Sequence, residues 1–156
     1  MLRISDLDLG LIATALADQS QNEHRWYLDP RTGGLHLWTA EGGLDGDGEF
    51  EIEDEELLRI EALPTYVWYQ DMADFAAAVT DEAAADRLAR AIQGKGAFRR
   101  FRSELHERYP ELLAVWKKFT DARSQRRAVD WLLDAALVDE QETQSFRDAH
   151  PDPAVP

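Results

Sequence analysis

The sequence predicts an α+β fold in a single domain: about five to six helices with a small two- or three-stranded antiparallel sheet, a β-hairpin, near the N-terminus. A length of 156 residues with 44% hydrophobic residues suits one domain with a packed core. Two runs rich in β-favouring residues, 23–28 and 35–39, flank a Pro/Gly turn. From residue 66 onward, apolar residues recur at helical spacing. We expect the domain to span residues 1–148 and residues 149–156 to be a disordered tail.

The first predicted element is a helix over residues 9–17. Its apolar run ends in Ala-Leu-Ala, as the export signal of a secreted protein does. However, Asp6 and Asp8 precede the run, where an export signal carries positive charge. Apolar residues at three- and four-residue spacing instead favour an amphipathic helix that packs in the core.

The β-hairpin is predicted next. With the turn near its centre, Trp26 and Leu28 share one face with Leu35 and Leu37, and that face is expected to lie in the core. The alternating acidic and apolar run 49–53 predicts a third strand at the edge of the sheet.

The rest of the chain is predicted to be helical. Residues 57–60 are expected to form a short helical turn, and longer helices follow. Gly94 ends one of these helices, Pro110 begins another, and Ser124 caps the last. The helix after the Gly-Lys-Gly motif is predicted to bury an apolar stripe made of Phe98, Phe101 and Leu105.

Charge is segregated along the chain, which has 17 basic and 31 acidic residues and a formal net charge of -14. Residues 1–93 carry six basic and 20 acidic side chains, residues 94–127 carry ten and four, and the remainder carries one and seven. Ten of the acids fall within residues 41–61. Net negative charge repels nucleic acid and anionic lipid at long range. Segregation indicates either polar recognition surfaces or two complementary parts of one fold.

The basic region 94–127 is a candidate binding surface. Basic side chains neutralise anions, and exposed aromatic rings stack on bases. Helical spacing places Glu104 four residues from both Arg100 and Arg108, so ion pairs are expected to weaken the positive field. Trp38, beside the acidic segment, is a candidate exposed anchor. The candidate binding residues are Lys95, Arg99, Arg100, Arg102, Lys117, Lys118 and Trp38.

Motifs for catalysis and metal binding are incomplete. The chain has no cysteine, which excludes thiol catalysis and Cys-based zinc sites. The motif Gly94-Lys-Gly lacks the Ser or Thr and the earlier glycine of a phosphate-binding P-loop. A calcium loop is matched in part, but Phe50 stands where the loop needs glycine. The weak metal candidates are Asp45, Asp47, Glu49 and Glu56. No catalytic residue and no cofactor is predicted.

Several short motifs occur in a distinctive order. The most specific is Gly94-Lys-Gly-Ala-Phe-Arg-Arg-Phe101. The supporting motifs are Tyr27-Leu-Asp29 with Thr32-Gly33, the acidic insert, residues 66–75, Tyr109-Pro110, Trp116 with Phe119, and Trp131-Leu132. Together they resemble a bacterial family catalogued as uncharacterised protein family 0158. The resemblance implies a compact, cytoplasmic α+β protein, and it transfers no functional residue because the family has no assigned activity.

Three functions remain open. The leading one is a non-enzymatic protein-interaction or adaptor domain that uses the acidic segment 41–61 and the basic region 94–127 to bind an unknown protein partner. The alternative is a nucleic-acid-binding protein that uses the basic region. The third is a hydrolase that depends on carboxylates or a metal, with Asp71 and Asp74 as one possible carboxylate pair. No membrane partner is expected, since no apolar run approaches the roughly 20 residues that span a bilayer.

Overall fold

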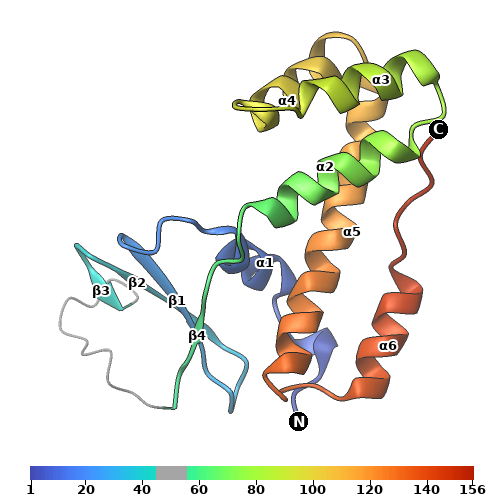
Figure 1. Ribbon diagram of the computed structural model, residues 1–156. Helices are drawn as coiled ribbons and strands as arrows, with labels where there is room; N and C mark the ends of the chain where they lie inside the picture. Colours follow the sequence, from blue (N-terminus) through green and yellow to red (C-terminus); the bar gives the residue numbers. More distant parts are fainter. Residues whose placement is uncertain (45–55) are drawn as a thin grey trace. The chain divides into compact units, whose positions relative to one another are not determined.

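The computed structural model describes residues 1–44 and 56–156, and Figure 1 shows how its helices and strands are connected. The chain begins with a short 3-10 helix, η1, and then runs through helices and strands in the order η1(Ile4–Asp6), α1(Leu9–Ala17), β1(His24–Leu28), β2(Leu35–Thr39), β3(Gly43–Leu44), β4(Leu58–Ile60), α2(Tyr66–Ala78), α3(Glu82–Ala91), α4(Ala97–Glu107), α5(Pro110–Asp134) and α6(Glu140–Ala149). Strands near the N-terminus followed by helices confirm the predicted α+β fold class.

Backbone contacts divide the chain into two compact units. Unit 1 is Met1–Leu63 with Ser124–His150, and it contains the sheet, α1 and α6. Unit 2 is Pro64–Arg123 with Pro151–Pro156, and it contains α2, α3 and α4. Helix α5 contributes its first part to unit 2 and its last part to unit 1. Because unit 2 has ten basic and ten acidic residues, the net charge of -14 belongs to unit 1.

The sheet of unit 1 is antiparallel, with the strand order β3-β2-β1-β4. Trp26 lies opposite Leu37 and Leu28 lies opposite Leu35, which confirms the predicted β-hairpin and its register. Leu28 is fully buried and packs in the same core as Ile12 and Leu16 of α1 and Leu132 of α5. In the hairpin turn, Gly33 has a φ of +78°, and a Cβ there would clash with Leu7 Cδ2.

Two of the predicted elements take a different form in the structure. Residues 58–60, expected in a helical turn, form β4, which pairs with β1. Buried Ile60 and exposed Arg59 alternate as in a strand, but so short a run does not distinguish strand from helix. Ser124 does not start a helix, because α5 continues through it and no glycine or proline interrupts residues 111–134. The predicted strand 49–53 lies outside the described residues.

Unit 2 is built around a cluster of aromatic rings. Phe75 of α2, Phe101 of α4 and Phe119 of α5 are buried, and the ring of Trp116 packs among them. The ring centroids of Phe101 and Trp116 are 4.8 Å apart, and those of Phe75 and Trp116 are 5.1 Å apart, both edge to face. Helix α3 adds Leu88 to this core. The cluster therefore fixes α4, and with it the turn between α3 and α4.

The C-terminal residues Pro151–Pro156, expected to be disordered, have defined contacts within unit 2. Asp152 accepts hydrogen bonds from Arg123 Nε and Nη2, at 3.2 and 3.0 Å. The backbone N–H of Thr80 donates to Pro156 O at 3.3 Å, and Val155 packs against the apolar core. The composition of this segment, with three prolines in six residues, predicts neither the ion pair nor the packing.

Candidate functional site

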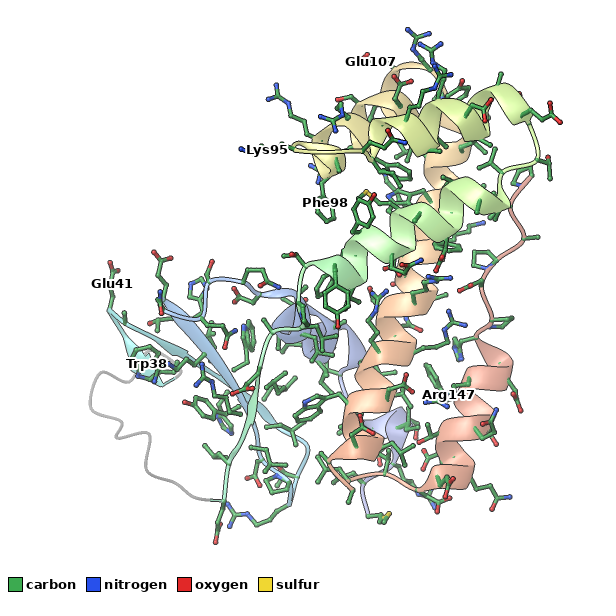
Figure 2. The ribbon with its side chains drawn as sticks, viewed as in Figure 1. Trp38, Glu41, Lys95, Phe98, Glu107 and Arg147 are labelled. Carbon is green, nitrogen blue, oxygen red and sulfur yellow. The ribbon has the colours of Figure 1, made fainter. Side chains whose placement is uncertain are left out.

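Basic residues gather where α3 turns back into α4. Between Arg87 and Ser103 the sequence has six basic residues and no acidic one: Arg87, Arg90, Lys95, Arg99, Arg100 and Arg102. The segment Glu82–Glu107, named here the basic hairpin, consists of α3, a short turn and α4. Figure 2 shows Lys95 at the turn, Phe98 at the start of α4 and Glu107 at the far end of that helix. Since α3 and α4 pack against each other, the hairpin brings cations from both helices together.

Two glycines shape the turn. Gly94 has a φ of +75° and Gly96 a φ of +78°, which is the left-handed region that favours glycine. A Cβ on Gly96 would also lie 3.1 Å from Arg100 Nη1, whereas a Cβ on Gly94 would meet nothing within 4 Å. The Gly-Lys-Gly motif is therefore a helix-to-helix turn, and Gly96 leaves room for the side chain of Arg100.

Arg100 holds this turn together. Its Nε donates to Ala91 O at 2.8 Å, and its two Nη atoms donate to the carbonyl oxygens of Lys95 and Gln93. The last carbonyl groups of a helix have no partner within the helix, and they carry the negative end of its dipole. The guanidinium of Arg100 satisfies such a carbonyl at the end of α3 and two more in the turn. Arg100 therefore has a structural role.

Glu104 is bound by two other arginines. Its Oε2 lies 3.5 Å from Arg87 Nε and 3.3 Å from Arg108 Nε. The predicted pair between Glu104 and Arg108 is confirmed, whereas Arg100, predicted to pair with the same carboxylate, contacts backbone carbonyls instead. Shared between two cations, Glu104 adds little negative field to the hairpin. Glu104 is partly buried, and both pairs are at least 3.3 Å long, so each is expected to contribute about 1 kcal/mol.

A depression of about 420 Å³ lies between α3 and α4. Arg90 and Arg99 are its most available cations, because Arg100 binds carbonyl oxygens and Arg87 faces Glu104. Both are exposed. Arg90 Nε makes one weak contact, 3.4 Å from Asp86 O, and the side chain of Arg99 has no hydrogen bond or ion pair with any residue that the structure describes. The lining residues are Arg87, Arg90, Ala91, Arg99, Arg100, Ser103 and Glu104.

Phe98 is more exposed than the sequence predicts. Its side chain is 42% exposed, whereas Phe101 and Leu105, expected on the same buried stripe, are 1% and 0% exposed. The prediction for Phe98 is wrong because the buried side of α4 centres on Ala97, Phe101 and Leu105, spaced four residues apart. Phe98 lies at the edge of that side. An apolar ring is therefore accessible on the surface between Lys95 and Arg99 in sequence.

The other predicted binding residues are dispersed. Lys95 and Arg102 are exposed on the basic hairpin, and Lys117 and Lys118 are exposed on α5; none of the four is among the residues that line the depression. Within residues 1–44 and 56–156, the side chains of these four residues form no hydrogen bond or ion pair. Trp38 belongs to unit 1, where it is partly buried and its ring lies 4.8 Å from the guanidinium of Arg25.

Three of the four candidate metal ligands, Asp45, Asp47 and Glu49, lie outside the described residues. Glu56 is exposed, and its Oε2 lies 2.8 Å from Arg31 Nη1. In the part of the chain that the structure describes, no three His, Asp or Glu side chains are grouped closely enough to hold a metal ion. In that same part, every helix is too short or too polar to cross a bilayer.

Asp71 and Asp74, a possible carboxylate pair, are bound by one cation. Arg123 Nη1 lies 3.1 Å from Asp71 Oδ1 and 2.6 Å from Asp74 Oδ2, and the same guanidinium binds Asp152. Burial on its own would raise the pKa of Asp74, but hydrogen bonds from Arg123 and Gln70 outweigh it and lower the pKa. Both carboxylates are therefore held by Arg123 in a structural ion cluster within unit 2.

Of the seven residues that line the depression, only Arg99 and Arg100 are among the predicted binding residues. The other five include two further arginines, Arg87 and Arg90. The two arginines precede Gly94, the first residue of the basic region 94–127. Their signal is in the sequence nonetheless: a helical hairpin with a tight turn pairs residues on either side of the turn, so a cluster of charge extends to both sides.

Comparison with known proteins identifies the family of the chain. The family described as "Uncharacterised protein family (UPF0158)" matches residues 7–147. UPF0158 protein PA5073 of Pseudomonas aeruginosa is 36% identical over 134 residues, which are 85% of this chain and 85% of that protein. No solved structure matches the chain. The resemblance seen in the sequence motifs is thereby confirmed, and the chain belongs to the uncharacterised protein family UPF0158.

Proposed function

We propose that this is a non-enzymatic interaction protein that binds an acidic segment of a partner protein through its basic hairpin. The arginine-lined depression supports the proposal most strongly. Arg100 holds the turn in place, and Glu104 is paired with Arg87 and Arg108. Arg90 and Arg99 are exposed on this rigid support. Arginine forks bind carboxylates in pairs of parallel hydrogen bonds, which gives both affinity and orientation.

The distribution of charge favours a short acidic segment over a long polyanion. Unit 1 carries the net charge of -14, whereas unit 2 is neutral and its cations are concentrated at the basic hairpin. Screening at physiological salt limits electrostatic attraction to about 8 Å. A short acidic peptide needs only the cations of the hairpin, whereas a long nucleic acid adds many more negative charges to a chain whose net charge is already -14.

The exposure of Phe98 supports nucleic-acid binding as a second candidate function. Single-stranded nucleic acid binds where basic side chains contact the phosphates and exposed aromatic rings stack on bases. Phe98 is 42% exposed, and Lys95 and Arg99 are exposed on either side of it in sequence. Stacking on Phe98 is the feature that distinguishes this candidate from the first, because an acidic peptide has no base to stack.

A binding titration separates the two candidates. Fluorescently labelled octaglutamate and a labelled single-stranded RNA of eight nucleotides would be titrated with the full chain at low and at physiological salt. We expect the peptide to bind, and the variant Arg90→Ala/Arg99→Ala to weaken its binding at least about tenfold, the effect of losing about 1.4 kcal/mol. The variant Lys117→Ala/Lys118→Ala removes the same charge from exposed sites in unit 2, and it is expected to bind almost normally.

Each other outcome has a defined meaning. If the RNA binds more tightly than the peptide and Phe98→Ala weakens it, the nucleic-acid candidate replaces the first. If the two double variants lose affinity equally, binding depends only on net charge and the basic hairpin is not the site. If neither probe binds even at low salt, the proposal is wrong.

A further inference from the structure

We infer that the depression between α3 and α4 holds a phosphoryl group carried on a side chain of the partner segment. The inference rests on the proposed function and adds the chemical group that the hairpin recognises. Three features of the depression support it: its net charge, the donors that remain available, and the rigidity of their support.

The charge of the depression matches a dianion. Its lining contains four arginines and one carboxylate, and that carboxylate, Glu104, is also contacted by Arg108 from outside the lining. A carboxylate side chain carries one negative charge, whereas a phosphorylated side chain carries about 1.5 to 2 at neutral pH. The more highly charged ligand therefore gains more from the same arginines.

The available donors also suit a phosphoryl group. Arg90 and Arg99 offer guanidinium N–H groups, and Ser103 adds a hydroxyl to the lining of the same depression. A phosphoryl group has three strong acceptor oxygens, so it engages two arginines and a hydroxyl at once. A carboxylate has only two oxygens to share among the same donors. The depression, at about 420 Å³, also leaves room for the side chain that carries the group.

The support of these donors is rigid. Arg100 follows Arg99 directly and binds three carbonyl oxygens at the end of α3 and in the turn. Phe101 and Leu105 anchor the opposite side of α4 in the aromatic core. Because both helices are fixed, the backbone positions of Arg90 and Arg99 are set before a ligand arrives, and binding loses less conformational entropy.

The test uses three labelled peptides that are identical except at a central position, which is phosphoserine, serine or glutamate, with acidic residues on both sides. We expect the phosphoserine peptide to bind the full chain about tenfold more tightly than the other two. The variant Arg90→Ala/Arg99→Ala should abolish this preference, and Ser103→Ala should reduce it. The charge-matched variant Lys117→Ala/Lys118→Ala should preserve it. The preference should also fall as the pH drops below about 6, where the phosphoserine loses its second charge.

Several results would overturn the inference. If the glutamate peptide binds as tightly as the phosphoserine peptide, the phosphoryl assignment is wrong, although the proposed function stands. If the preference survives in Arg90→Ala/Arg99→Ala, the phosphoryl group binds elsewhere. If inorganic phosphate alone binds as tightly as the phosphopeptide, the site takes free phosphate and not a modified side chain. If no peptide binds, both the inference and the proposed function are wrong.

Discussion

Replacing Arg100 by alanine removes the side chain that connects the end of α3 to the start of α4. The substitution deletes the bond from Nε to Ala91 O, which is 2.8 Å long and partly buried, and two exposed bonds to Gln93 O and Lys95 O. It leaves the apolar core of unit 2 unchanged, since Arg100 is exposed. The loss of stability therefore measures the contribution of the three hydrogen bonds.

The expected loss is about 2 kcal/mol. A hydrogen bond from a charged donor contributes about 1.5 to 3 kcal/mol in a buried setting, and less where water replaces the donor. We count about 1 kcal/mol for the partly buried bond to Ala91 and about 0.5 kcal/mol for each exposed bond. A loss of 2 kcal/mol makes the equilibrium constant for the opening of unit 2 about 30-fold larger.

Amide hydrogen exchange measures this loss within unit 2, without assuming that the whole chain unfolds in one step. The amides of Phe101 and Leu105 should exchange about 30-fold faster in Arg100→Ala. Arg99→Ala removes a neighbouring exposed arginine whose side chain has no described partner. The free energy of opening obtained from its exchange rates should stay within about 0.5 kcal/mol of that of the parent chain. Equal exchange rates in the two variants would refute the structural role of Arg100.

Three further predictions follow from the structure. Gly96→Ala should destabilise unit 2 by about 1 to 2 kcal/mol and more than Gly94→Ala in urea denaturation, because both positions have positive φ but only a Cβ on Gly96 meets Arg100. Arg123→Ala should lower the free energy of unfolding by about 3 kcal/mol, because it removes the cation that is paired with the buried carboxylate of Asp71. Asp152→Asn should lower it by less than about 1 kcal/mol, because Asp152 is partly exposed. The lowered pKa of Asp74 means that its stabilising contribution is complete above the ordinary pKa of 3.8 and is lost as the pH falls through the lower folded value. An NMR titration of the Asp74 carboxyl should therefore show its pKa rise in Arg123→Ala.

Local signals in the sequence predict much of the fold. The β-hairpin follows from β-favouring residues around a Pro/Gly turn, and its register follows from the side on which Trp26 and Leu28 lie. Pro110 does begin a helix, as the preference of proline for the first helical turn predicts. The helix α6 was missed, although Asp139 and Glu142 have the spacing of a helix start, and Asp139 does accept a hydrogen bond from Glu142 N.

Features that depend on distant residues were not predictable. The strand β4 is only three residues long, and it is a strand because it pairs with β1, whose residues lie at least 30 positions earlier in the sequence. The sequence identifies Lys95 and Arg99 as exposed cations from charge alone. It does not separate them from Arg100, because the role of Arg100 depends on the left-handed turn at Gly96 that brings carbonyl oxygens within its reach.

The division of the arginines into one that holds the turn and two that bind the ligand is the central claim, and the Nε–H signals of the arginine side chains test it directly. These signals would be followed by NMR while the phosphoserine peptide is added to the full chain. We predict that the signals of Arg90 and Arg99 shift with saturation, while that of Arg100, already bonded to Ala91 O, stays in place. A shift confined to Arg100, or no shift in Arg90 and Arg99 at saturating peptide, would contradict the account.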